Sequence, residues 1–190
     1  MITKFEEIFI EHCAPLLARL KVSNLFSVQF DNYDELCDKI DTLNNALNKK
    51  DIYIKILKKS DCSQSNYLIF AYRKTKLSER VNEKLIKNFL TKYGYSKCSL
   101  LEDYLLVLKN KLISYDSFPH EIGIFLGYPL NDVKAFIKEK GKNFVACGTW
   151  KVYSNKIHYE KVFSVYKKCK EIYTDLYKNG HSIDGLAVAS

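Results

Sequence analysis

The stretch FPHEIGIFLGYPLNDVKAFIKEKGKNFVACGTWKVYS, residues 118–154, sets the interpretation of the whole chain. It holds two of the three prolines, four of the seven glycines and the single tryptophan of the 190-residue sequence. Glycine frees the backbone and proline restricts it, so their concentration here predicts tight local geometry. Elsewhere the chain shows ordinary helix and strand patterns, which we expect to form a scaffold around this stretch.

Within the stretch, the pattern predicts two helices and one strand. The first helix covers 119–126 and ends in a Gly-Tyr-Pro turn. The second helix is expected to use Asn131 or Asp132 as its N-cap and to end before Gly141. Residues 143–153 predict one strand, and the glycine in its middle indicates a bulge or a close backbone approach.

The segments before the stretch predict a helix and a hairpin. Residues 33–50 carry an apolar stripe at helical spacing, which predicts an amphipathic helix. The stripe consists of Leu36, Ile40, Leu43 and Leu47. Residues 51–59 and 66–74 are rich in β-forming side chains and are joined by a polar, turn-like segment. They predict an antiparallel hairpin. Residues 23–30 are interpreted as a loop or a short extended piece.

Three more helices are predicted from periodicity. They cover 77–92, 99–113 and 155–180, the last of which carries tyrosines at a seven-residue repeat and predicts a packed tyrosine face. Ser99 and Glu102 have the spacing of a capping box at the start of the second of these helices.

The N-terminal segment is predicted to break at a proline. Residues 3–12 have helical periodicity, and Pro15 is expected to open a new short helix over 14–20, because proline suits the first turn of a helix better than its interior. This interpretation places Cys13 at or next to a helix N-terminus.

Together these patterns predict an α+β fold: a small antiparallel sheet of about three strands packed with several amphipathic helices. The chain has no internal repeat, low-complexity segment or linker. We therefore expect one domain over 1–180, followed by a loosely held C-terminal tail at 181–190.

Composition narrows the class of protein. Hydrophobic residues make up 47% and charged residues 27% of the chain, as in a folded globular protein. The net charge of +8 allows an anionic partner, but the lysines are scattered and form no block. The six cysteines include no CxxC pair, and no segment has the pattern of a signal peptide or the apolar length of a bilayer span. We expect a cytoplasmic protein with reduced thiols and no membrane insertion.

The leading functional hypothesis is a cysteine-dependent acyl-transfer or amide-bond enzyme, with no cofactor and no metal. Cys13 would be the nucleophile, because the positive end of a helix dipole favours a thiolate. His120 would act as its base, with Glu121 as the orienting acceptor. Asp116 and Asp132 are alternative acceptors. The competing interpretation is that Cys13 is a small buried side chain and His120 belongs to a turn.

The substrate of such an enzyme is expected to be an acyl or peptide-like small molecule, free or bound to a carrier. Asn24, Tyr128, Cys147 and Trp150 are the predicted substrate-binding residues.

Two non-enzymatic alternatives stay open. One is a metal or haem site, for which the ligand types are suitable although the spacing is not diagnostic. The other is nucleic-acid binding through a helix-turn-helix-like segment at 119–142. The candidate ligands of the first are His12, Cys13, His120, Glu121 and Cys147, and the polar residues of the second are Asn131, Lys134, Lys138 and Lys142.

Three segments, HCAPLLARLKVSNLFS, FPHEIGIFLGYPLNDVKAFI and KNFVACGTWKVYSN, resemble those of a family of small uncharacterised proteins from anaerobic bacteria, a domain of unknown function. The shared motifs are HCAP, FPHEIGIFLGYP and CGxWKVY. The resemblance covers nearly the whole chain. It implies a single domain with these boundaries and no established activity.

Overall fold

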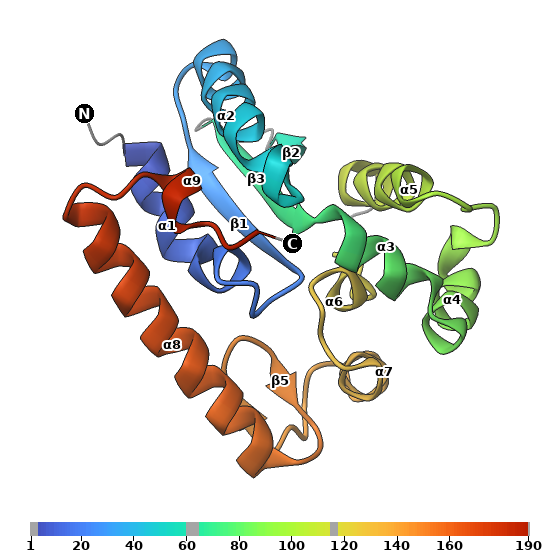
Figure 1. The fold of residues 1–190 in the computed structure, drawn as a ribbon. Coiled ribbons are helices and arrows are strands. Elements are labelled where there is room, and N and C mark those ends of the chain that lie inside the picture. The colour runs from blue at the N-terminus through green and yellow to red at the C-terminus, as the bar shows by residue number, and fades with distance from the viewer. Residues whose placement is uncertain (1–3, 60–64, 115–117, 190) are drawn as a thin grey trace. The chain divides into compact units, whose positions relative to one another are not determined.

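The computed structural model describes residues 4–59, 65–114 and 118–189 (Figure 1). Their fold is α+β, with a three-stranded antiparallel sheet, a small two-stranded hairpin and surrounding helices, which confirms the predicted class. The chain forms two compact units. Unit 1 comprises Met1–Thr75 and Lys168–Ser190, and unit 2 comprises Lys76–Lys167.

The sheet of unit 1 has the order β1-β3-β2. Its strands are β1 (Ser23–Gln29), β2 (Ile52–Lys59) and β3 (Asn66–Arg73), and both pairings are antiparallel. The predicted β2–β3 hairpin is confirmed, although its turn lies in residues 60–64, outside the described part of the chain. The segment interpreted as a loop or extended piece forms β1, an edge strand.

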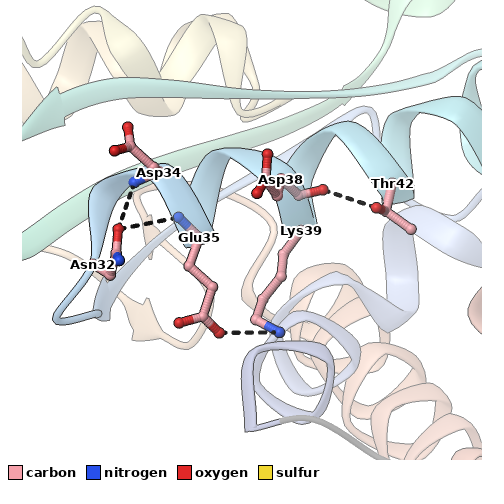
Figure 2. A network of polar contacts seen from close by, with 6 residues as sticks. All are labelled: Asn32, Asp34, Glu35, Asp38, Lys39 and Thr42. Carbon is pink, nitrogen blue, oxygen red and sulfur yellow. Dashed lines mark hydrogen bonds and ion pairs between the residues drawn. The ribbon is translucent and has the colours of Figure 1, made fainter.

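Helix α2 (Tyr33–Leu47), followed by the single turn η1 (Asn48–Lys50), confirms the predicted amphipathic helix. Its N-cap is Asn32, whose side-chain oxygen accepts hydrogen bonds from the backbone N–H groups of Asp34 and Glu35 at 2.9 and 3.2 Å (Figure 2). The exposed face carries an ion pair between Lys39 and Glu35 at 3.4 Å. The opposite stripe enters the core of unit 1 and consists of Leu36, Ile40, Leu43 and Leu47.

Helix α1 (Lys4–Leu17) runs without a break through Pro15, so the predicted break near Cys13 is wrong. Pro15 lies in the last turn, where it removes only the hydrogen bond to the carbonyl of Glu11. Leu16 and Leu17, which follow it, are fully buried in the core, and their burial offsets that loss. Cys13 consequently lies in the helix interior and not at a helix N-terminus.

The C-terminal residues are packed, which corrects the expectation of a loosely held tail. After α8 (Lys156–Lys178), the short helix α9 (Ile183–Leu186) buries Ile183 and Leu186 in the same core as α1 and α2. The ammonium of Lys50 donates to the carbonyls of Asp184 and, at 2.7 Å, Ala187. Burial and backbone hydrogen bonding therefore hold this segment in unit 1.

Unit 1 also buries an arginine. The guanidinium of Arg73, at the end of β3, is fully buried and donates to backbone carbonyls at 2.8 to 3.0 Å. Since it reaches segments that are far apart in the sequence, Arg73 ties the end of α1, the turn before β2 and the C-terminal segment together. Its acceptors are the carbonyls of Leu16, Leu17, Lys50 and Val188.

Four helical segments, α3 (Lys74–Asn82), α4 (Lys84–Leu90), η2 (Thr91–Tyr95) and α5 (Leu101–Ser114), lead into and through the first part of unit 2. The single helix predicted over 77–92 is wrong, because Glu83 has an extended ψ of 129° and separates α3 from α4. The capping box predicted from Ser99 and Glu102 at the start of α5 is replaced by a different cap. The carboxylate of Asp103 accepts hydrogen bonds from the N–H groups of Ser99 and Leu100, both at 2.9 Å.

The quoted stretch forms α6 (Ile122–Phe125), α7 (Leu130–Lys138), β4 (Ala146–Cys147) and β5 (Lys151–Val152). The two short helices agree with the prediction. The single strand at 143–153 does not, since the chain reverses between β4 and β5 and the two pair antiparallel. The glycine interpreted as a bulge lies in this turn. The first half of α8 completes unit 2.

Candidate functional site

A cavity of about 430 Å³ lies within unit 2. One side is built from residues 118–136, which include α6 and the start of α7, and the other from the β4–β5 turn. The structure brings four of the sequence-predicted site residues to its wall: His120, Tyr128, Cys147 and Trp150. These residues come from segments about 20 to 30 positions apart in the sequence, so the convergence is produced by the fold.

Trp150 is the centre of the aromatic wall. Its ring stacks on Tyr128 at 5.0 Å between centroids and meets the edges of Phe163 and Tyr159 at 4.7 and 5.3 Å. Its indole N–H donates to Asp132 at 2.9 Å. Because stacking and the hydrogen bond act together, the indole has a fixed orientation in the wall.

Asp132 is buried and does not cap α7 as predicted, since Pro129 occupies the N-cap position. One carboxylate oxygen accepts from the indole of Trp150, and the other accepts from the backbone N–H of Tyr153 at 3.0 Å. The carboxylate therefore joins α7 to the β4–β5 hairpin, and its hydrogen-bonding capacity is used within the unit.

Tyr128 follows the turn after α6 and is anchored at both ends. Burial raises the pKa of its phenol to about 12, and the hydroxyl donates to the carbonyl of Thr149 at 3.1 Å. The guanidinium of Arg80 donates to the carbonyls of Ile124 and Tyr128 at 2.8 and 2.5 Å. These contacts hold the turn, and hence the aromatic wall, against α3.

Two glycines allow the walls to pack closely. A Cβ at Gly123 would lie 2.8 Å from a methyl group of Val133, and a Cβ at Gly148 would lie 2.2 Å from the ring of Phe163. Both distances are below those that real Cβ atoms show. The β4–β5 turn is consequently seated directly on the ring of Phe163 in α8.

His120 and Cys147 are both exposed and lie on the cavity wall. The imidazole meets the ring of Phe136 edge-on at 5.0 Å between centroids. Within residues 4–59, 65–114 and 118–189, neither the imidazole nor the thiol makes a hydrogen bond. They are the side chains of the wall most available for chemistry with a ligand.

Lys151 is a wall residue that the sequence analysis missed. It pairs directly with Cys147 in the β4–β5 hairpin. Its ammonium donates to the carbonyl of Gly141 at 2.8 Å and lies 4.9 Å from the ring centre of Phe144. Phe136 was missed as well. Its position three residues after Val133, on the same helix face, is the signal that could have identified it.

Glu121 lies in an ion pair beside a second cavity of about 500 Å³. Its carboxylate is 4% exposed and pairs with the ammonium of Lys111, and it accepts from the hydroxyl of Tyr95 at 3.3 Å. Burial, with the adjacent carboxylate, raises the pKa of Tyr95. No hydrogen bond joins Glu121 to the ring of His120 among the described residues. Of the alternative acceptors, Asp132 is bound to Trp150, and Asp116 lies outside the described residues.

Cys13 and Asn24, two further predicted site residues, belong to unit 1. Cys13 is fully buried in α1, and burial raises the pKa of its thiol. Asn24 donates to the carbonyl of His12 at 2.8 Å and accepts from the ammonium of Lys21 at 2.6 Å. Burial lowers the pKa of Lys21 to about 8. These interactions give Asn24 a structural role, and the raised pKa keeps the thiol of Cys13 protonated at neutral pH.

The described residues offer no group of three or more His, Cys, Asp or Glu side chains that could hold a metal ion. None of the described helices combines the length and apolar character needed to cross a bilayer.

Comparison with known proteins places the chain in a family. The family described as "Protein of unknown function (DUF3793)" matches residues 9–187, so the chain belongs to it, and the predicted resemblance is confirmed. Neither the curated proteins nor the solved structures include a match to the chain.

Proposed function

We propose that this member of the DUF3793 family binds the acyl chain or aromatic body of a small molecule in the cavity of unit 2. The observation that carries the proposal is the nature of the wall. It is predominantly apolar and aromatic, and the carboxylate of Asp132, the indole N–H of Trp150 and the hydroxyl of Tyr128 are already hydrogen-bonded within the unit. A ligand is therefore recognised mainly by apolar contact.

The size of the cavity agrees with a small ligand. Pockets for such ligands usually measure about 300–1,000 Å³, and this one measures about 430 Å³. Each methylene group that leaves water for such a site contributes about 0.8 kcal/mol. A medium-length acyl chain is consequently a suitable ligand. A peptide is less suitable, because its backbone amides would lose water without gaining partners.

The nucleic-acid alternative has less support. The first helix of the predicted helix-turn-helix, α6, is only four residues long. Asp132 in the second helix is buried and bonded to Trp150, although Asn131, Lys134, Lys138 and Lys142 are exposed. For the metal alternative, the described residues contain no group of three or more His, Cys, Asp or Glu side chains that could hold an ion. Cytoplasmic localisation stays a prediction from the cysteine pattern.

The single tryptophan provides the test, because Trp150 lies in the cavity wall and is the only source of tryptophan fluorescence. Titration with octanoate, 1-octanol or 2-naphthol should give a saturable change in its emission. Val133→Phe fills the cavity from the side of α7 and should weaken binding by at least about tenfold, or about 1.4 kcal/mol. Val145→Phe is the matched control, since Val145 is exposed and does not line the cavity.

Two results would overturn the proposal. One is an emission that stays constant or changes without saturation for all three ligands. The other is equal affinity in the Val133→Phe variant, the Val145→Phe variant and the wild type, which would place the ligand elsewhere. Circular dichroism checks that Val133→Phe is folded. If it is not, Phe136→Ala, which removes an aromatic ring from the same helix face of the wall, replaces it in the comparison.

A further inference from the structure

Three residues with chemically different side chains line the unit 2 cavity: Cys147 with a thiol, His120 with an imidazole and Lys151 with an ammonium. Each could take part in acyl chemistry. A thiol is an intrinsically strong nucleophile, an imidazole accepts and returns a proton near neutral pH, and an ammonium stabilises a developing oxyanion.

The hairpin fixes two of these groups relative to each other. Cys147 and Lys151 are direct partners in the antiparallel β4–β5 pair. Directly opposite residues project to the same face of a hairpin, with Cβ atoms about 4.5–5.5 Å apart. The turn between them is seated on Phe163, and Lys151 is held by the carbonyl of Gly141. The thiol and the ammonium are therefore presented to the cavity together by a constrained turn.

The imidazole of His120 approaches the cavity from the other segment. Pro119, which precedes it, is buried and restricts the backbone there. The ring rests edge-on against Phe136 and makes no hydrogen bond with the described residues. Both ring nitrogens thus remain available to a group in the cavity.

The other cysteines have different surroundings. Cys13, Cys98 and Cys169 are buried, and Cys37 belongs to unit 1. Cys62 lies outside the described residues. Among the cysteines whose positions are described, Cys147 alone is both exposed and on the wall of an apolar cavity.

We propose that Cys147 is an acyl acceptor that takes the acyl group of a thioester whose chain occupies the cavity, an inference that rests on the proposed function. The Cys147 sulfur attacks the carbonyl carbon, and His120 takes the thiol proton. Lys151 stabilises the oxyanion of the tetrahedral intermediate. The carbon–sulfur bond of the donor then breaks, and His120 returns the proton to the departing thiolate. The products are an acyl-Cys147 thioester and a free thiol, so no oxidant or reductant is required.

The test uses the full chain and octanoyl-N-acetylcysteamine as the thioester donor, with intact-mass spectrometry as the readout. We expect one octanoyl group per chain, located on Cys147 by peptide mapping and absent in Cys147→Ala. His120→Gln should slow the reaction by about 100-fold or more at neutral pH. Lys151→Met should slow it less, and Cys37→Ser should leave it unchanged. His120 and Cys147 are exposed, so their variants are expected to fold.

The inference is overturned if Cys147→Ala is acylated as fast as the wild type, if several cysteines react equally, or if His120→Gln reacts at the wild-type rate. The proposed function is judged separately by octanoate binding to Cys147→Ala through Trp150 emission. Saturable binding without acylation of the wild type defeats only the acyl-acceptor role. Absence of binding defeats the proposed function.

Discussion

Replacement of Glu121 by leucine is expected to lower the free energy of unfolding substantially, because the carboxylate forms a buried ion pair. Its side chain is 4% exposed and that of its partner Lys111 is 18% exposed. Removing one member of a buried pair leaves the other charge uncompensated and costs about 3–5 kcal/mol. The hydrogen bond from Tyr95, at 3.3 Å, is long, and its loss adds about 0.5 kcal/mol.

The double variant separates this coupling from simple loss of packing. Lys111→Met alone leaves the carboxylate buried without its partner and should cost a similar amount. Glu121→Leu combined with Lys111→Met replaces the pair by apolar side chains of similar volume, which is often neutral or stabilising. We therefore expect the double variant to regain most of the lost stability. Urea unfolding followed by circular dichroism and Trp150 emission gives the four free energies of the cycle.

The reasoning would be refuted if the double variant lost as much free energy of unfolding as the two single variants together, because the effects of independent sites add and those of coupled sites do not. A loss below about 1 kcal/mol for Glu121→Leu would refute it as well. The isosteric Glu121→Gln tests the catalytic role predicted from the sequence. This variant also loses the charge, so it should be destabilised like Glu121→Leu. If circular dichroism shows that it is folded but it fails to acylate Cys147, Glu121 acts in the chemistry as well as in the ion pair.

Two further predictions concern buried cations of unit 1. Burial lowers the pKa of Lys21 to about 8 from 10.5, because the fold disfavours the charged ammonium. Above the ordinary pKa the ammonium is neutral in both states and the fold has its full stability. As the pH falls through about 8, the buried group becomes charged and that stability is lost. Relative to Lys21→Met, wild-type stability in urea should rise by on the order of 3 kcal/mol from pH about 7.5 to about 10.5, at about 1.4 kcal/mol per pKa unit; parallel profiles would contradict this. Arg73→Met should cost at least about 4 kcal/mol, because its carbonyl acceptors stay buried; a thermal melt unchanged from the wild type would show that water or a rearrangement satisfies them.

The parts of the fold that were predicted correctly have strong periodic patterns. Leu36, Ile40 and Leu43 repeat at helical spacing, and the alternating β-formers around Ile54 and Ile69 identify the hairpin. In both cases local propensity and burial agree, so the pattern alone is sufficient. The helix over 156–178 was correct for the same reason.

The parts that were predicted wrongly depend on tertiary contacts. Pro15 indicates a break when considered locally, yet the burial of Leu16 and Leu17 continues the helix through it. Gly148 suits a bulge or a turn equally well in the sequence, and only its approach to the ring of Phe163 in α8 favours the turn.

The candidate site was predicted in part. His120, Tyr128, Cys147 and Trp150 were recognised because reactive and aromatic residues are concentrated in a glycine-rich segment, where functional loops are common. Cys13 was chosen for its residue type and its expected position at a helix end. Neither its burial nor the raised pKa that follows from burial can be deduced from the residues that flank it.

The composition of unit 1 from both ends of the chain has a consequence for biosynthesis. Residues 76–167 are contiguous and form an insertion within unit 1, so they emerge from the ribosome as a complete folding unit. Unit 1 folds later, because α9 and the carbonyl of Val188, which accepts a hydrogen bond from Arg73, are made after unit 2. The contacts of unit 1 also join segments that are far apart in the sequence, before residue 76 and after residue 167, and such long-range contacts slow folding. A chain that ends before Ile183 would therefore contain every residue of unit 2 but would lack the residues that complete the core of unit 1.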